Sequence, residues 1–583
     1  MKKVIISTIT LLTLSVVSSC SDFLTVDPVD KQVKESYYTS AESVKANTAS
    51  LYGLVWWDFT HRFMYQGGDM LSGDLFYTYA EEGQFFLNTV QPENLYSLQG
   101  WNGLFRVVSY ANSIIDDMPE MARDNNISED VITEALGEAY LFRAVAYYYL
   151  TEYWGDVPIV TSPTELITSG NTTDMFLPRN THSSLYRFIC EDLDRAIEAL
   201  PKTPSEAGRV TYYSALGFKA KVYLTRGCYE GNAEYFASAK ECAEEVITNG
   251  PALFGDYSTM FDSSADNCSE SLIAVQCMTG GYGYGNNRSI EWGRRDALIG
   301  TSCWGSGKGP TLSLQELFEE HPADGRRQWV YMQLGDSYPL LDNYTYYNYY
   351  SEKDDYSVWI DQLNFTRAHA KKYVINSEGG TLIGTMQDGE NNLYLLRVAD
   401  LYFVYAEACL AGNLDATLTD ATALGYINQV LDRGNAGYNV SELSYMDLIK
   451  ERRREFAFEG CNWFDIKRVA YLNEQKALDY LNGMYRDKQY KLNYEKINEA
   501  TGNAYTNEDI FIYGNQQDYY VRGWLSEIDA EDWTDAGTND NIDTSNRSGV
   551  ITLTSSSLYI AIPSDATTNA PILLEEPVDY YQE

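Results

Sequence analysis

The stretch "ERRREFAFEGCNWFDIKR" runs from Glu451 to Arg468 and mixes acidic and basic side chains with large aromatic ones. Glu451, Glu455 and Glu459 are spaced four residues apart, which places all three on one face of a helix. Three arginines, Arg452 to Arg454, stand between the first two glutamates. Paired carboxylates can hydrolyse glycosides, but carboxylates interleaved with guanidinium groups favour an ion-pair network. We therefore predict a structural helix that locks neighbouring helices together.

Further helical segments lie on both sides of this stretch. A helix around 100–118 is expected to stop near Pro119, because proline lacks the backbone N–H that a helix uses for its hydrogen bonds. The segments 209–227 and 233–250 form a helical pair, and each ends in glycine. Small and aromatic residues alternate over this pair, as in a tetratricopeptide repeat. The sequence predicts a mostly α fold built on such helix pairs.

The middle of the chain has a different character. From about residue 251 to 389, glycine, tyrosine and tryptophan become dense and helical periodicity fades, apart from "SLQELFEEH". Helices return after that, and the chain is again loop-rich beyond Asp518. We predict a helical region at 37–250, a large irregular loop-rich region at 251–390 and a C-terminal region at 391–583, together forming one compact unit. Loops held by a rigid scaffold commonly bind ligands.

The N-terminus reads as a targeting signal. Two lysines precede an apolar run from Val4 to Val17, which is too short to span a bilayer comfortably. Small residues then precede Cys20, as in a bacterial lipoprotein signal. We expect a signal peptide at 1–19, acyl chains on Cys20 and a tether at 20–36. The alternative is an ordinary secretory signal with an accidental cysteine.

Charge and motif content exclude several classes of function. The chain has 43 Lys+Arg against 83 Asp+Glu, a net charge of −40, which disfavours nucleic-acid binding. The nine cysteines include no C-x-x-C pair, and the four histidines share no triad-like motif. "GSGKGPT" fails as a phosphate loop because Gly309 follows Lys308. Acidic stretches at 262–270 and 529–543 could hold calcium but lack EF-hand spacing, so we predict no metal and no cofactor.

Five segments together resemble the signatures of the SusD/RagB family. They occur in the family's order, and the first stretch quoted above is the most specific of them. The tail "TNAPILLEEPVDYY" departs from the family's asparagine-rich ending, although Tyr559, Pro563 and Asn569 still fall in place. The other four segments are "GEAYLFRAVAYYYLTEYWGDVPIV", "LRVADLYFVYAEACLAGN", "INQVLDRG" and "YIAIPSDATTNAPIL".

The resemblance implies a function as well as a fold. Members of this family are surface lipoproteins of the outer membrane in glycan-foraging Gram-negative anaerobes. They cover a SusC-like TonB-dependent transporter, bind oligosaccharides or, in a minority, peptides, and are not enzymes. The resemblance therefore implies a lipid-anchored glycan-binding protein that delivers oligosaccharides to such a transporter.

Three loop-like stretches combine aromatic rings with polar side chains, which suits sugars because rings stack on C–H faces while polar groups bond the hydroxyl rim. For any single ring among them, packing between loops is the alternative. The predicted ligand residues are Asp69, Asp74 and Tyr77 in the first stretch, Tyr282, Tyr284, Asn286 and Trp292 with Trp304 in the second, and Tyr347 and Tyr349 in the third.

Two alternatives to glycan capture stay open. A strongly acidic surface could favour basic peptides. A lipid-anchored glycosidase would need two carboxylates at catalytic separation in one cleft.

Overall fold

The structure, a computed structural model, describes residues 37–77, 80–162, 176–293, 304, 308–332, 336–339, 341, 344–345, 368–375, 387–484, 489–492, 511–513, 525–527 and 552–581. Most of these residues are helical and the strands are short, so the predicted mostly α fold is confirmed. The longer helices are α2 (Ala41–Ala49), α4 (Leu95–Asp124), α5 (Glu129–Trp154), α7 (His182–Ala199), α8 (Tyr212–Glu230), α9 (Ala233–Asn249), α12 (Leu312–Glu319), α16 (Val398–Cys409), α17 (Ala421–Arg433), α18 (Tyr445–Phe456), α19 (Asn462–Leu472) and α20 (Glu474–Asn482).

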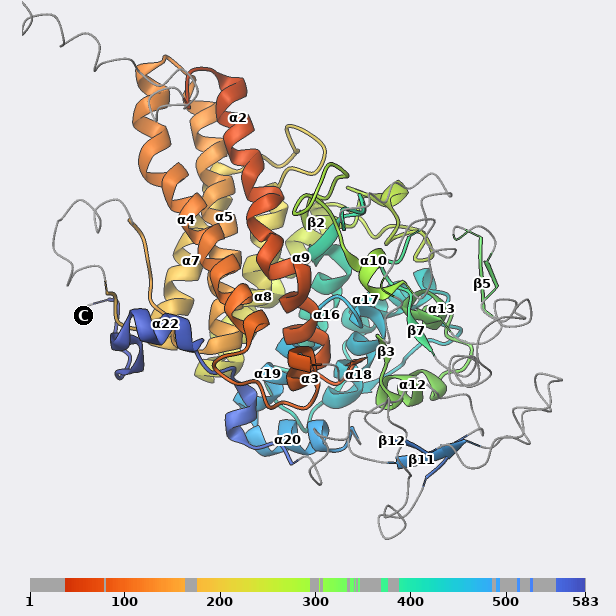
Figure 1. Cartoon of the computed structure of the whole chain (residues 1–583). Helices are drawn as coiled ribbons and strands as arrows, with labels where there is room; N and C mark the ends of the chain where they lie inside the picture. The colour runs from red at the N-terminus through yellow and green to blue at the C-terminus, as the bar shows by residue number, and fades with distance from the viewer. Residues whose placement is uncertain are drawn as a thin grey trace, which may run out of the picture.

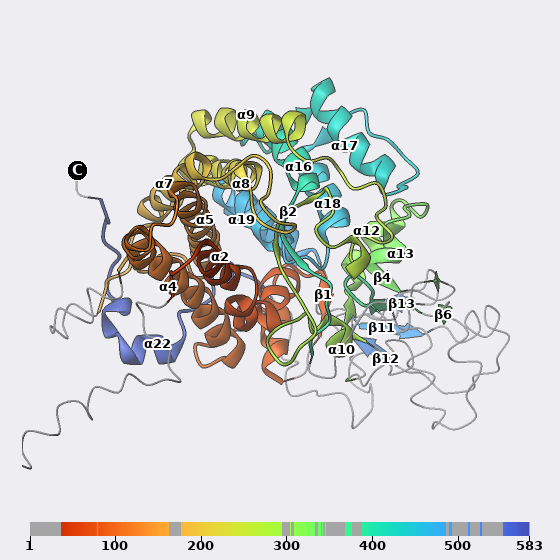
Figure 2. The same ribbon diagram turned by 90° about the horizontal axis from the view of Figure 1, so that it is seen from above.

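The helices pack on one another largely in chain order. Helix α4 packs on α5, α5 on α7, α7 on α8 and α8 on α9, and Figure 2 shows them side by side. Helix α9 then packs on α16, although about 150 residues separate them. The stack of helices thus continues directly from α9 to α16, although a long segment of the chain separates them in sequence. One large apolar core runs through both parts.

A two-stranded antiparallel ribbon brings together the two ends of the chain segment that lies between α9 and α16. Strand β2 (Ser271–Val275) pairs antiparallel with β8 (Leu393–Arg397), which leads directly into α16. Between these strands lie short elements such as α10 (Arg288–Trp292) and α13 (Arg327–Val330) (Figure 1). The remaining strands are β1 (Leu75–Phe76), β3 (Gly309–Pro310), β4 (Tyr331–Met332), β5 (Ser337–Tyr338), β6 (Tyr344–Thr345), β7 (His369–Ala370), β9 (Thr417–Leu418), β10 (Leu443–Ser444), β11 (Gln489–Leu492), β12 (Phe511–Tyr513) and β13 (Leu525–Glu527).

The C-terminal segment, residues 552–581, returns to the N-terminal helices. Ile560 N donates to Tyr153 O, and Val578 N donates to Arg179 O. This segment includes α22 (Ser564–Asn569), which lies well apart from α10, at the left of Figure 1, whereas α10 lies to the right. The C-terminal segment is therefore fixed to the N-terminal helical region.

Helix boundaries differ from the sequence prediction at several places. Helix α8 runs past Gly227 to Glu230, and Gly231 caps it. Helix α4 continues past Pro119 to Asp124, because Met118 and Ala122 on either side of the proline are fully buried in the core. Helix α18 ends at Phe456, since Phe458 has a φ of 68° that a helix cannot accommodate. Glu459 therefore lies beyond the helix that carries Glu451 and Glu455.

Short helical turns lead from α2 to α4. They are η2 (Ser50–Tyr52), η3 (Leu54–Trp56), η4 (Phe59–Phe63) and η5 (Gln66–Met70), of which η4 and η5 are π-helical. Gly103 of α4 lets η4 lie close, because a Cβ there would stand 2.7 Å from Phe59 N. π-Helical turns are rare and frequently mark functional sites.

Candidate functional site

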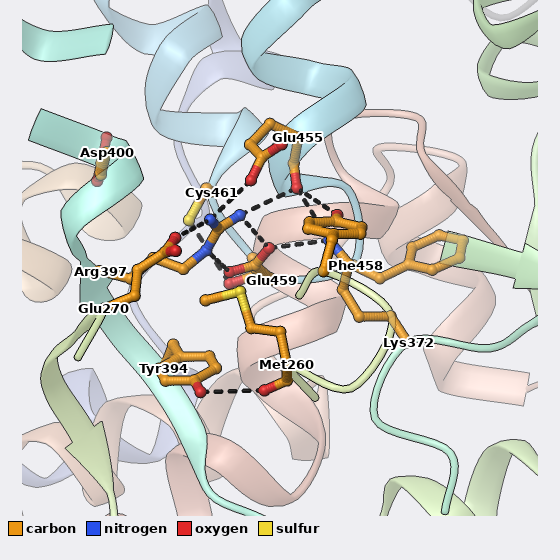
Figure 3. Close-up of polar contacts among 12 residues, drawn as sticks. Met260, Glu270, Lys372, Tyr394, Arg397, Asp400, Glu455, Phe458, Glu459 and Cys461 are labelled. Carbon is orange, nitrogen blue, oxygen red and sulfur yellow. Dashed lines mark hydrogen bonds and ion pairs between the residues drawn. The ribbon is translucent and has the colours of Figure 1, made fainter. Parts of the chain in front are cut away.

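The quoted stretch around α18 lies at the centre of a buried charge cluster. Figure 3 shows Arg397, from the end of β8, surrounded by three glutamates. Its Nη1 lies 2.7 Å from Glu270 Oε1 and 2.8 Å from Glu455 Oε1, and its Nε lies 2.8 Å from Glu459 Oε2. All four side chains are buried. The cluster joins the ribbon β2–β8 to α18 and confirms the predicted ion-pair network.

Further cations complete the cluster. Arg433 contacts Glu270 at 2.6 Å and Glu455 at 2.5 Å. Arg326 contacts Glu451 at 2.6 Å and Glu455 at 3.3 Å. Every one of these glutamates therefore has at least one guanidinium partner.

The electrostatics of Glu455 suit an ion pair rather than a proton donor. Burial alone would raise the pKa of Glu455, but Arg433, Arg397 and Arg326 lower it to about 2. A general acid in glycoside hydrolysis needs a carboxyl whose pKa is raised. The carboxylate of Glu455 thus stays charged at neutral pH.

We expect this pairing to make stability depend on pH in acid. Because the pKa of Glu455 is lowered from 4.5 to about 2 by folding, its contribution is complete above pH 4.5 and is lost as the pH falls through 2. Urea unfolding of the chain and of Glu455→Gln, compared between these limits, should differ in slope by about 1.4 kcal/mol per pH unit. Equal slopes would contradict the assignment.

Two predicted ligand residues belong to the interior, and the prediction for them is corrected. Asp69 is fully buried and accepts hydrogen bonds from Phe458 N at 3.0 Å and Gly460 N at 3.1 Å. Asp74 is also fully buried and pairs with Arg453. Both carboxylates tie the N-terminal turns to the chain around α18. Their partners lie almost 400 residues away in sequence, so no local pattern could reveal them.

Asn286 and Trp292 are corrected for the same reason. Asn286 is buried and its side chain donates to Asn391 O at 3.1 Å. Trp292 is 1% exposed and packs edge-on against Tyr65 and Phe458. Asn286 and Trp292 therefore pack in the interior and are too little exposed to contact a ligand.

The other aromatic residues of the same stretch form a surface. Tyr282, Tyr284 and Trp304 are 52%, 47% and 50% exposed. Tyr282 packs edge-on against Trp57 with ring centroids 4.8 Å apart, and Trp57 stacks on His61 at 4.6 Å. We call Tyr282, Tyr284 and Trp304, together with Trp57 and His61, which are buried against Tyr282, the aromatic surface.

The side chain of Arg62 contacts Trp304 in the aromatic surface. Its guanidinium lies 5.3 Å from the ring centroid of Trp304, a cation–π contact. Since His61 contacts Tyr282 and Arg62 contacts Trp304, adjacent residues of η4 bring both exposed rings to one region.

A layer of paired charges lies beneath the aromatic surface. Glu291 Oε1 lies 2.9 Å from Arg62 Nε and 3.4 Å from Lys308 Nζ. Burial would raise the pKa of Glu291, but Lys308 and Arg62 lower it. Lys308 Nζ also lies 4.3 Å from the ring centroid of Tyr77, which is half-buried. The paired charges of Lys308, Glu291 and Arg62 thus link Tyr77 to Trp304.

The loop that carries Tyr282 and Tyr284 is held by hydrogen bonds from its backbone to Asp388. Asp388 Oδ2 accepts from Gly280 N and Gly281 N, both at 2.8 Å. These glycines have φ values of 154° and 134°, which side chains disfavour. The loop is therefore pre-shaped by a carboxylate about 100 residues away.

Removing this carboxylate should loosen the loop. A hydrogen bond to a charged group is worth about 1.5–3 kcal/mol, so Asp388→Ala should speed exchange of the Gly280 and Gly281 amides by about 10- to 100-fold. Hydrogen-exchange mass spectrometry on peptides covering 278–284 measures this. Asp388→Asn, which keeps an acceptor oxygen, is the matched control and should fall between the two. Unchanged exchange in Asp388→Ala would disprove the clamp.

The remaining predicted residues lie outside the described residues: Cys20, Tyr347 and Tyr349. Trp57, His61, Arg62 and Asp388 were not predicted. The sequence "WWDFTHRF" held a signal for the first three, since Trp57 and His61 are one helical turn apart. Asp388 gave none, because its role depends on a distant loop.

The described residues contain neither a membrane-spanning helix nor a cluster of metal ligands. None of their helices combines the length and apolarity needed to cross a membrane. In the same part of the chain, no three histidine, cysteine or carboxylate side chains are placed to hold a metal ion together.

Comparisons with known proteins place the chain in a family. Residues 23–224 match the family described as "Starch-binding associating with outer membrane", and residues 292–534 match the "SusD family". A SusD-like protein of Bacteroides ovatus is 29% identical over 97% of this chain and 96% of its own length. The starch-binding protein SusD of Bacteroides thetaiotaomicron is 24% identical over 58% of this chain and 65% of its own length. A crystal structure with a xylogluco-oligosaccharide is 26% identical, with a TM-score of 0.73 over 93% of this chain and all of that one.

These similarities cover both the N-terminal helices and the region around α18, and they agree in fold with the structure described above. The chain belongs to the SusD/RagB family.

Proposed function

We propose that this chain is a surface lipoprotein of the outer membrane that binds oligosaccharides and delivers them to a SusC-like TonB-dependent transporter, without catalysing a reaction. The observation that carries the proposal is the aromatic surface, where Tyr282, Tyr284 and Trp304 each leave about half of the side chain exposed. Exposed rings of this size on a soluble surface commonly mark a binding site.

The chemistry of the aromatic surface suits a sugar. A pyranose offers a face of C–H groups that stacks on an aromatic ring and a rim of hydroxyls that bonds polar atoms. The rings stand on charges already paired with each other, as Arg62 is with Glu291. Such a base holds the rings in place while leaving their outer faces free.

Two relatives support the class of ligand. One solved structure contains a xylogluco-oligosaccharide, and another relative is named as a starch-binding protein. Both ligands are chains of neutral sugars. The net charge of −40 also favours neutral over anionic glycans.

The anchor and the transporter partner rest on the family. One family is described as associating with the outer membrane. Cys20 at the end of the apolar N-terminal run would carry the lipid. Cys20→Ser should then move the protein from the membrane fraction to the soluble fraction.

Affinity electrophoresis and calorimetry with starch, xyloglucan, laminarin and host glycans test the binding. We expect at least one neutral glycan to bind with a micromolar to millimolar Kd. Retention of none of them, together with binding of basic peptides, would replace the proposal with peptide capture. Release of shortened sugars during incubation would point to a glycosidase.

A further inference from the structure

Two aliphatic side chains are exposed beside the aromatic surface. Leu54 of η3 is 47% exposed, and Met278, at the start of the loop that carries Tyr282 and Tyr284, is 59% exposed. Leucine and methionine are usually buried, since exposure leaves apolar area in water. Apolar side chains that are exposed together commonly mark an interaction site.

Leu54 lies against the loop between the two tyrosines. Gly283, with a φ of 97°, separates them in the chain, and a Cβ there would lie 3.1 Å from Leu54 Cδ1 and 3.9 Å from Trp57 Cγ. The ring of Tyr282 packs edge-on against the same Trp57. Leu54 is therefore a direct neighbour of the residues that hold an exposed ring.

Met278 lies where the same loop closes. Its backbone N donates to Tyr284 O at 3.0 Å, which brings residues 278 and 284 together. Two residues earlier, Gln276 N donates to Tyr52 O at 2.6 Å and ties the loop to the turn that precedes Leu54. These contacts hold Leu54 and Met278 next to the exposed tyrosines. We call Leu54 and Met278 the aliphatic edge.

An unsubstituted sugar makes poor use of the aliphatic edge. Its rim consists of hydroxyls, and each hydroxyl that loses water on binding needs a polar partner. The side chains of Leu54 and Met278 carry no hydrogen-bond donor, and the thioether of Met278 is only a weak acceptor. A methyl group on the sugar gains from the same contact, because it leaves water for an apolar surface.

We infer that the aliphatic edge receives the methyl group of an acetylated neutral sugar bound at the aromatic surface. An acetyl group carries its methyl beyond the hydroxyl rim, so it reaches side chains beside the ring on which the sugar stacks. The contact is the same for an O-acetyl ester and an N-acetyl amide, and both leave the sugar uncharged. This inference rests on the proposed function and adds which substituent the glycan carries.

Two pairs of sugars that differ in their acetyl groups test the aliphatic edge and distinguish the two sources. O-acetylated xylo-oligosaccharides are compared with the same preparation after mild alkali, and chitotetraose is compared with cellotetraose. Calorimetry gives a Kd for each member. The ratio of the Kd values within a pair is the readout, because a general loss of affinity affects both members and cancels.

We expect the acetylated member of at least one pair to bind about 4-fold more tightly, the gain from removing one methyl group from water. In Leu54→Ser/Met278→Ser protein the ratio should fall to about 1, whereas Met278→Leu, which stays aliphatic, should keep it. Leu574, which is 72% exposed in the C-terminal segment, provides the control, and Leu574→Ser should not change the ratio.

The outcomes separate the aliphatic edge from the proposed function. Equal Kd values within both pairs on the unaltered chain overturn the aliphatic edge and leave glycan binding standing. A preference for the acetylated sugar that persists in Leu54→Ser/Met278→Ser protein also overturns it. If none of these sugars binds, the aliphatic edge is overturned, and starch, xyloglucan and laminarin then decide the proposed function.

Discussion

Replacing Arg397 by methionine should lower the free energy of unfolding by about 3 kcal/mol or more. The guanidinium of Arg397 touches Glu270, Glu455 and Glu459, and none of the four side chains is exposed by more than a few per cent. Removing one partner of a buried ion pair leaves charge that burial has already stripped of water. Methionine fills similar space, so the loss reports the charge and not a cavity. Urea unfolding at neutral pH measures it.

The matched control is an exposed pair of the same chemistry. Arg123 contacts Glu129 at 2.7 Å, but the two side chains are 54% and 62% exposed. Arg123→Met should leave the free energy of unfolding nearly unchanged, because water screens and solvates both charges. Arg397→Lys, which keeps the charge but loses the forked geometry, should fall between the two. If Arg397→Met and Arg123→Met shift the unfolding midpoint equally, the buried cluster does not fix the scaffold.

The helices and this cluster were accessible from sequence for a physical reason. Helical periodicity and the four-residue spacing of Glu451 and Glu455 are local, and local spacing determines which face a side chain takes. The partner Arg397 was not accessible, because it comes from a strand more than 50 residues earlier. Pro119 misled the prediction of α4, since burial of Met118 and Ala122 outweighs one missing backbone hydrogen bond.

The binding surface was predictable only in part. Composition identified the stretch that contains Tyr282, Tyr284 and Trp304, which are exposed, but it could not separate them from Asn286 and Trp292, which are buried. That division depends on the conformation of a glycine-rich loop. The conformation in turn depends on Asp388, about 100 residues later. Polar residues such as Asp69 were predicted as ligand groups, because the sequence does not show whether a carboxylate is buried or exposed.

Loss of the exposed rings should remove most of the glycan affinity. Alanine in place of a stacking aromatic residue costs about 1–2 kcal/mol, so Tyr282→Ala and Trp304→Ala should each weaken binding about 5- to 30-fold. The two rings are held by different neighbours, Trp57 for one and Arg62 for the other. Their effects should therefore add, which gives about 100-fold for the double variant. Calorimetry with the glycan that binds most tightly measures the three values.

Two controls separate stacking from general damage. Tyr282→Phe keeps the ring and loses only the hydroxyl, so it should bind within about 5-fold of the original chain. Tyr580, which is 40% exposed in the C-terminal segment, is a tyrosine of similar exposure away from α10, and Tyr580→Ala should leave this affinity unchanged. A double variant that still binds within a few-fold would move the ligand off the aromatic surface altogether. A double variant that loses binding while keeping its unfolding midpoint would show that the rings act on the ligand, since the charges beneath them are paired without it.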